Sequence, residues 1–308
     1  ANFSQIFSLY SDPDDGVVQL LKGGTTGPPL IDVTDEDQTL HQLWRVSQCE
    51  VLREVSQRLS EESLFIADGH HRYETALNYR NYMAAAQPRK TGKEPFNYVM
   101  MYLTPLEGEG MLILPYHRVI HNIEQFDFDS LEKKLDEYFE VTAFPFNGTT
   151  KPDVWKQFND QLKERGTIRP AFGMYGAGQS SFHLLLLREH VYDSFTDTAE
   201  SSSILKKLDV NVIESCIFKK VLGITSKDLQ QQENISYVHV SDEGLELVVT
   251  KGHQLAFFLN DTKSSEIRDV SSRGETMPQK STFFYPKLLS GLVINKIGPD
   301  ESSEPSWI

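Results

Sequence analysis

The stretch FIADGHHRYETALNYR at residues 65–80 constrains the fold more than any other part of the chain. Its apolar start predicts a short strand that ends at Asp68. From His70 onward, apolar residues recur at helical spacing, at Tyr73, Ala76, Leu77 and Ala84. Gly69 between them permits the tight turn that such a junction needs. The sequence therefore predicts a strand, a two-residue turn and a helix in direct succession.

The residues at this junction have the chemistry of an anion site. Backbone N–H groups at a helix start have no partner within the helix, and they carry partial positive charge. Arg72 is suited to clamp phosphate oxygens, while His70 and His71 donate imidazole N–H bonds. Thr75 shares a helical face with His71. Asp68 is suited to bind magnesium or to accept a hydroxyl proton.

Each of these residues also has a structural interpretation. Asp68 is a residue type that caps helices, and capping alone explains its position. Two histidines beside an arginine at a glycine turn are harder to explain by structure alone. Arg72 is expected to serve binding more than packing.

Two further basic positions are candidates for phosphate binding. His117 and Arg118 end a predicted strand, where they either join a site or pair at the surface. Lys280, followed by Ser281 and Thr282, either closes over phosphates or protects an edge strand from pairing.

The order of the predicted elements indicates an α+β protein (mixed α/β). Residues 98–104 and 111–115 are predicted to form a hairpin, and residues 245–250 a strand. The pattern changes character near residue 122. We therefore expect a first domain at residues 1–122, which contains the DGHHR site, and a second α+β domain at residues 123–308.

Composition excludes some classes of function. The 308 residues include 30 Lys and Arg against 44 Asp and Glu, a formal net charge of −14. A general nucleic-acid or membrane-surface binder needs a basic face, so neither partner is expected. The two cysteines, Cys49 and Cys216, have no metal-binding spacing and suit a reducing compartment. We expect a cytoplasmic protein.

Four blocks of the sequence together resemble an uncharacterised bacterial family, domain of unknown function 1015. The blocks are IADGHHRYETALNYR, LPYHRVI, LDVNVIESCIFKKVLGI and MPQKSTFFYPKLLSGLVI, in that order along the chain. The resemblance also implies a further N-terminal segment, so this chain is expected to be a fragment or a shortened relative.

The DGHHR block in turn resembles the signature of the ParB/sulfiredoxin superfamily. The resemblance implies a ParB/sulfiredoxin-like core, with Gly69 at the turn and His71 and Arg72 holding nucleotide phosphates. His70 stands where sulfiredoxins have their reactive cysteine, which argues against sulfinic-acid chemistry. Free serine kinases of this superfamily carry an Asp-Gly-His block, and Asp68 matches its hydroxyl-activating acid. The resemblance thus implies phosphoryl transfer.

These observations lead to one preferred function and two alternatives. The preferred function is a nucleotide-binding phosphotransferase that uses ATP or ADP and Mg²⁺ on a small hydroxyl metabolite such as serine. A metal-dependent phosphatase or hydrolase and a non-catalytic nucleotide-sensing module are the alternatives. Asp68 and His70 are the expected catalytic residues, and Asp68 the metal ligand. The expected phosphate- and nucleotide-binding residues are Gly69, His71, Arg72, Thr75, His117, Arg118 and Lys280. The partners expected are the nucleotide and the substrate, and the oligomeric state is left open.

Overall fold

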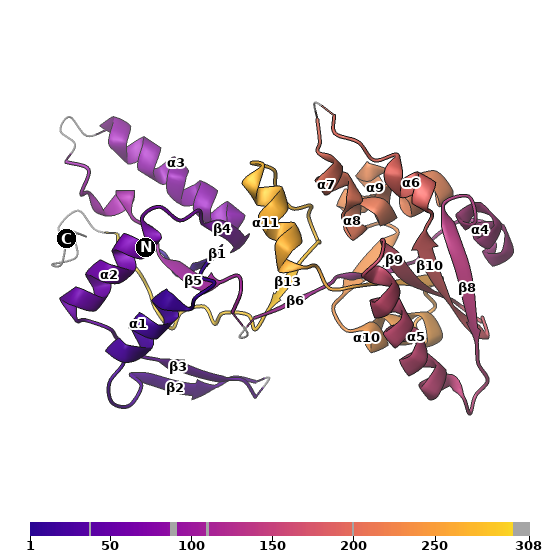
Figure 1. Ribbon diagram of the computed structural model, residues 1–308, viewed down its shortest axis with the longest axis horizontal. Helices are drawn as coiled ribbons and strands as arrows, with labels where there is room; N and C mark the ends of the chain where they lie inside the picture. Colours follow the sequence, from indigo (N-terminus) through magenta and orange to yellow (C-terminus); the bar gives the residue numbers. More distant parts are fainter. Residues whose placement is uncertain (37, 87–90, 109–110, 199, 298–308) are drawn as a thin grey trace. The chain divides into compact units, whose positions relative to one another are not determined.

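The computed structural model describes residues 1–308 except 37, 87–90, 109–110, 199 and 298–308. It divides into two compact units, which are Ala1–Met111 with Pro286–Ile308, and Leu112–Tyr285. Helices and several separate sheets occur in the chain (Figure 1). This confirms the predicted α+β class. That a domain boundary follows residue 122 stays a prediction.

The first unit has a three-stranded sheet of order β4-β1-β5. Strand β1 is central, antiparallel to β4 and parallel to β5. All five residues of β1 are buried, as expected for a central strand covered on both faces. A separate hairpin pairs β2 with β3. The elements are β1 (Ile6–Tyr10), α1 (Gly16–Gly24), β2 (Ile31–Thr34), β3 (Leu40–Leu43), α2 (Cys49–Leu59), β4 (Phe65–Asp68), α3 (His70–Ala86), η1 (Pro95–Asn97) and β5 (Met101–Pro105).

The second unit has a six-stranded antiparallel sheet of order β11-β7-β12-β9-β10-β8. A short ribbon pairs β6 with β13. Its strands are β6 (Leu112–Leu114), β7 (His117–Ile120), β8 (Phe139–Pro145), β9 (Ala171–Gly176), β10 (Ser181–Leu187), β11 (Ile235–Val238), β12 (Leu255–Leu259) and β13 (Phe283–Tyr285). Its helices are α4 (Phe128–Leu135), α5 (Lys151–Gly166), α6 (Glu189–Asp193), α7 (Ser203–Lys207), α8 (Asp209–Val212), the π-helical η2 (Ile213–Val221), α9 (Ser226–Gln231), α10 (Ser241–Thr250) and α11 (Ser264–Ser272).

Each face of this sheet packs on its own hydrophobic core (Figure 1). Helices α4, α8 and η2 contribute to one core, and α5 and α10 to the other. Because successive side chains of a strand point to opposite faces, β7 supplies Ile120 to the first core and Val119 to the second. The same alternation places the side chains of His117 and Arg118 on opposite faces of the sheet.

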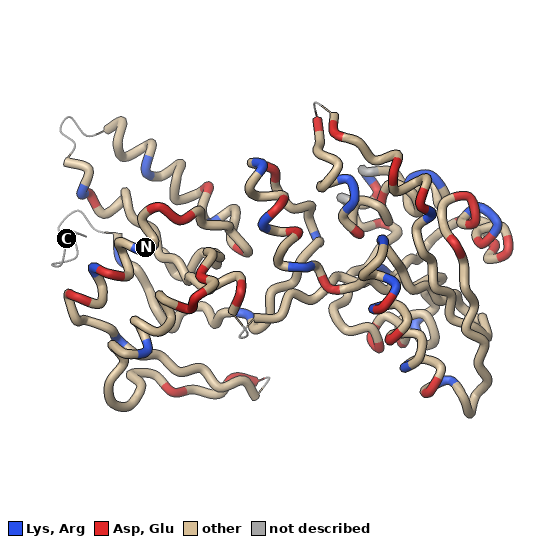
Figure 2. Tube along the Cα trace, viewed as in Figure 1, with Lys and Arg blue, Asp and Glu red and all other residues tan. Residues whose placement is uncertain are grey.

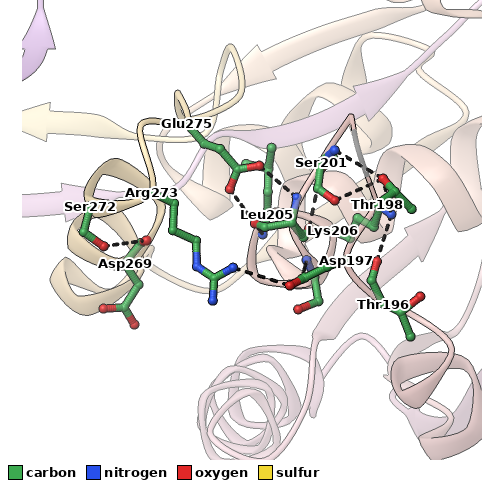
Figure 3. A network of polar contacts seen from close by, with 12 residues as sticks. Thr196, Asp197, Thr198, Ser201, Leu205, Lys206, Asp269, Ser272, Arg273 and Glu275 are labelled. Carbon is green, nitrogen blue, oxygen red and sulfur yellow. Dashed lines mark hydrogen bonds and ion pairs between the residues drawn. The ribbon is translucent and has the colours of Figure 1, made fainter.

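A polar network in the second unit ties α7 to the segment after α11 (Figure 3). The Ser202 N–H donates to a carboxylate oxygen of Glu275 at 2.8 Å, and the Ser202 hydroxyl donates to the other oxygen. The Arg273 side chain reaches Asp197 at 3.6 Å, and Asp197 also accepts from the Ser203 N–H. These contacts fix the start of α7, and the chain continues from α7 directly into α8.

Two of the predicted elements are wrong. The expected hairpin does not form, because β5 pairs with β1 and β6 pairs with β13. Residues 245–250 lie in helix α10 and not in a strand. Asp242 and Glu243 in the first turn of α10 favour a helix start there. Short apolar runs are equally compatible with a buried strand and a buried helix face.

The charged residues are interspersed in both units. Figure 2 shows both Lys and Arg and Asp and Glu in each of the two units. Among the described residues, no helix is long and apolar enough to cross a membrane.

Asp209, the first residue of α8, is an acid with an unusual pKa. Burial and the nearby Glu266 raise the pKa of Asp209 to about 7, against the opposing effects of Lys263 and Arg118. Between about pH 4 and pH 7 the unfolded chain has therefore released this proton while the folded chain keeps it. The ionisation of Asp209 therefore does not affect the free energy of unfolding at low pH. It lowers this free energy progressively as the pH rises from about 4 to 7.

We predict that Asp209→Asn stabilises the protein at pH 8, by up to about 4 kcal/mol at 1.36 kcal/mol per pKa unit. At pH 4 the stabilisation should be below about 1 kcal/mol, because Asp209 is then neutral in the folded chain and only about half ionised in the unfolded chain. Urea unfolding at the two pH values measures this, with Asp160→Asn on the exposed side of α5 as control. A stabilisation that is equal at both pH values would contradict the assignment.

Candidate functional site

The junction of β4 and α3 has the geometry that the sequence predicts. Asp68 ends β4, Gly69 follows with φ 90°, and α3 begins at His70. The first bond of the helix runs from the Tyr73 N–H to the Gly69 carbonyl, at 3.0 Å. Within the described chain, the N–H groups of residues 70–72 have no hydrogen-bond acceptor. They are thus available at the positive end of a 17-residue helix.

The Arg72 side chain turns back from α3 toward the chain that enters β1. Its Nη1 donates to the Ser4 hydroxyl and to the Gln5 carbonyl, and its Nη2 lies 3.3 Å from Asp68 Oδ2. Phe7 pairs with Asp68 across the sheet, which brings the N-terminal segment within reach of the first turn of α3. Arg72 therefore has a structural role that the sequence did not predict.

The C-terminal segment brings a second cation to Asp68. Asn295 forms two backbone hydrogen bonds with Asn2, so the returning chain lies along the N-terminus. Lys287 Nζ is 3.9 Å from Asp68 Oδ2. From the block MPQKSTFFYPKLLSGLVI, Lys280 is the residue predicted from the sequence, and the structure places another lysine of that block, Lys287, beside the DGHHR stretch.

The Asp68 carboxylate is not a helix cap. Its Oδ2 contacts Arg72 and Lys287, and it accepts no bond from a backbone N–H among the described residues. Its Oδ1 has no partner in that same part of the chain. Half of the side chain is exposed, so this oxygen is open to a ligand.

The other predicted residues of this stretch face outward or bond within the helix. His70 is exposed, and His71 is 97% exposed and 3.3 Å from Glu74. The Thr75 hydroxyl donates to the His71 carbonyl at 2.7 Å, as serines and threonines inside helices often do. These three residues are exposed, whereas Arg72 and Asp68 contact each other and other parts of the first unit.

Gly69 is required for two reasons. Its backbone φ of 90° is one that residues with a side chain rarely adopt. A Cβ atom at this position would also lie 2.7–2.9 Å from the Arg72 guanidinium. We predict that Gly69→Ala costs about 1–3 kcal/mol of stability and displaces Arg72. Chemical unfolding measures the loss, with Gly92→Ala as a control that has φ 85° and no neighbouring atoms. Equal losses in both variants would show that close approach to Arg72 is unimportant.

His117 lies in the second unit and has a structural environment. It is buried in β7, where its Nδ1 accepts from the Leu259 N–H at 3.2 Å and its ring packs on Phe258. Burial, with smaller effects from Arg118 and His239, lowers the pKa of His117 to about 4. The imidazole is therefore neutral near pH 7, which weakens it as a phosphate ligand.

Arg118 and Lys280 are brought together in the second unit. Arg118 is only 4% exposed, and its Nη2 donates to the Lys280 carbonyl at 3.0 Å. Lys280 precedes β13 at φ 56° and its Nζ lies over the Tyr116 and Tyr237 rings. It is thus in a turn and not on the edge strand that the alternative interpretation requires.

Comparison with known proteins identifies the chain at the level of the family. The family model described as "Protein of unknown function (DUF1015)" matches residues 1–211. This confirms the predicted family resemblance. No curated protein matches the chain.

A comparison with solved structures found matches that cover most of the chain, all with low identities and TM-scores. A mutant of free serine kinase in complex with ADP has a TM-score of 0.36 and 12% identity, over 91% of this chain and 84% of that one. A conserved hypothetical protein from Pyrococcus furiosus has the same score and identity, over 92% and 90% of the two chains. Free serine kinase in complex with AMP has a TM-score of 0.32 and 9% identity, over 91% and 83%.

Proposed function

The chain belongs to the DUF1015 family, whose function is unknown, and we propose that it is a nucleotide-binding phosphotransferase that acts on a small hydroxyl metabolite such as serine. The nucleotide, ATP or ADP, places its phosphates at the start of α3. Asp68 activates the acceptor hydroxyl or holds Mg²⁺. Arg72 and Lys287 bind the charge that develops on the transferred group.

One observation supports this function above the others. The Asp68 carboxylate lies between two cations at the start of a long helix, 3.3 Å from Arg72 and 3.9 Å from Lys287. Phosphoryl transfer needs positive charge around the phosphate and an acid beside the attacking hydroxyl. Asp68, Arg72 and Lys287 supply an acid and two cations beside the start of α3, and all three side chains are partly exposed.

The Asp68 carboxylate also fits magnesium. Mg²⁺ is typically held by one or two carboxylates together with substrate phosphates and water. Oδ1 of Asp68 has no partner among the described residues, so a single protein ligand is available. A bound Mg²⁺ would neutralise phosphate charge. The residues that this chain itself provides are Asp68 for the ion and Arg72 for the phosphate oxygens.

The hydrolase alternative requires Asp68, His70 and His71 to act as joint metal ligands. In the described part of the chain there is no group of three or more potential metal-ligating side chains, and His71 pairs with Glu74. No observation favours this function over phosphoryl transfer. The sensing module differs from the proposed enzyme only by the lack of turnover, which experiment decides.

The test is ³¹P NMR of the protein with Mg²⁺ and either ADP or ATP, with and without a panel of hydroxyl metabolites that includes serine. We expect a phosphomonoester to appear only when both a nucleotide and an acceptor are present. Inorganic phosphate without acceptor would indicate the hydrolase instead. Nucleotide binding without any product would indicate the sensing module.

A further inference from the structure

A second candidate site lies wholly within the second unit. A cavity of about 320 Å³ is bounded by Arg118 and Tyr237 on the sheet, by Glu214 and Phe218 on η2, and by the turn that contains Lys280. This volume is within the range of small-molecule sites. The cavity involves no residue of the DGHHR stretch, so the inference is independent of the proposed phosphotransferase.

Arg118 is a buried cation that makes no direct ion pair among the described residues, although Asp209 and Glu214 are close enough to favour its charged form. Its guanidinium donates to the Tyr116 and Lys280 carbonyls. A guanidinium has five N–H groups, so the other three have no acceptor among the described residues. Across those residues, no carboxylate lies within ion-pair distance of Arg118. Because this buried guanidinium keeps N–H groups without an acceptor, an anion that enters the cavity gains charge-assisted hydrogen bonds.

Tyr237 and Lys280 complete the polar end of the cavity. Tyr237 lies opposite Arg118 in the β11–β7 pair, so their side chains share one face of the sheet. The guanidinium carbon of Arg118 lies 5.7 Å from the Tyr237 ring centre. Lys280 Nζ lies at the same distance from that ring. The Tyr237 hydroxyl has no partner in the described chain, so it too is available to a ligand.

The charges of the lining favour a monoanion over a phosphate dianion. Arg118 and Lys280 contribute two positive charges and Glu214 one negative charge, which leaves one positive charge. Glu214 is held by Lys219 at 2.9 Å, and it repels a second negative charge. The remaining walls include the apolar side chains Val210, Phe218, Leu229 and Pro278.

The helix that lines the cavity is unusual. Residues Ile213–Val221 form a nine-residue π-helix, a rare geometry that often occurs at functional sites. Its Glu214 and Phe218 both face the cavity. The π-helix is therefore a second observation, besides the buried Arg118, that indicates a functional site here.

We propose that this cavity binds a small monocarboxylate with a compact apolar body. Arg118 takes the carboxylate through its free N–H groups, with Lys280 and the Tyr237 hydroxyl as further donors. The apolar body lies against Phe218 and its neighbours. Recognition of a planar carboxylate by an arginine fork is both strong and orientation-specific.

Ligand-observed NMR with three probes tests the proposal. Benzoate is the carboxylate probe, benzamide is its neutral analogue and inorganic phosphate is the competing oxyanion. Benzoate should bind at least about tenfold more tightly than benzamide, because a charge-assisted contact is lost in the amide. Phosphate should bind more weakly than benzoate.

Two mild variants locate the binding without removing the buried arginine. Lys280→Met should lower the affinity for benzoate about threefold to tenfold, and Tyr237→Phe should lower it about tenfold. Lys251→Met, at the exposed end of α10, is the matched control and should bind benzoate like the wild type. Equal affinity for benzoate and benzamide, tighter binding of phosphate, or wild-type affinity in Lys280→Met would each overturn the proposal.

Discussion

Asp68→Asn is expected to lower the rate of phosphoryl transfer by about 10²–10⁴-fold, the usual contribution of a positioned acid or base. The amide keeps the shape of the side chain but cannot accept a proton, and it is a poor magnesium ligand. ADP affinity without Mg²⁺ should be unchanged or higher, because a negative charge beside the phosphates is removed. Rates by ³¹P NMR and ADP affinity by calorimetry separate the two effects.

The fold should be little affected by this change. Asp68 and Arg72 are both more than a third exposed, and ion pairs of this kind contribute about 0–1 kcal/mol. Glu74→Gln is the matched control, because Glu74 is an exposed acid near the start of α3 and pairs with the exposed His71. Full activity in Asp68→Asn, with only a lower melting temperature, would show that Asp68 is structural.

Arg72→Ala is expected to have the second largest effect, on both affinity and stability. A charged donor contributes about 1.5–3 kcal/mol, so ADP affinity should fall by roughly 10–100-fold. Stability should fall by a similar free energy, because the Ser4 hydroxyl and the Gln5 carbonyl lose the donor that joins them to α3. Calorimetric titration and urea unfolding of the same preparation measure the two losses.

Arg80→Ala controls for the loss of an arginine from the same helix. Arg80 is exposed, and its hydrogen bond is to the neighbouring Asn81. Arg80→Ala should change neither the free energy of ADP binding nor the free energy of unfolding by more than about 0.5 kcal/mol, as is usual for surface substitutions. If Arg72→Ala lowers stability and leaves ADP affinity at the wild-type value, Arg72 serves only to hold the N-terminal segment.

The local part of the candidate site could be predicted from the sequence. An apolar run, a glycine and a helical repeat specify the β4–α3 junction through neighbouring residues alone. The φ of Gly69 and the start of α3 at His70 follow from that pattern. Turn and helix signals of this kind act over a few residues, so a single sequence contains them.

The partners of Asp68 could not be predicted in this way. Lys287 reaches Asp68 because the C-terminal segment pairs with the N-terminus, a contact between residues far apart in the chain. From the block that contains both lysines, Lys280 is the residue predicted from the sequence, and nothing in the block indicates Lys287 instead. The β5 partner was missed for the same reason, since parallel pairing with β1 is set by the whole sheet and not by the neighbouring strand.

Helix α10 shows a different limit. The run at residues 245–250 has the composition of a strand, but only Gly244 and Val248 of α10 are buried, one helical turn apart. Packing against the sheet determines whether this run forms a helix or a strand, so the outcome depends on the tertiary structure and not on the local sequence.

ADP binding to the wild type and to Lys287→Met, measured by calorimetric titration in low salt, shows whether phosphates bind at the start of α3. Lys287 was not needed for the sequence prediction, and only the structure places it beside Asp68. If phosphates bind at the start of α3, ADP should bind the wild type and bind Lys287→Met about threefold to thirtyfold more weakly, since a charge-assisted contact is lost. The same ADP affinity in both proteins, or no ADP binding to either, would show that Lys287 and Asp68 do not form part of a phosphate site.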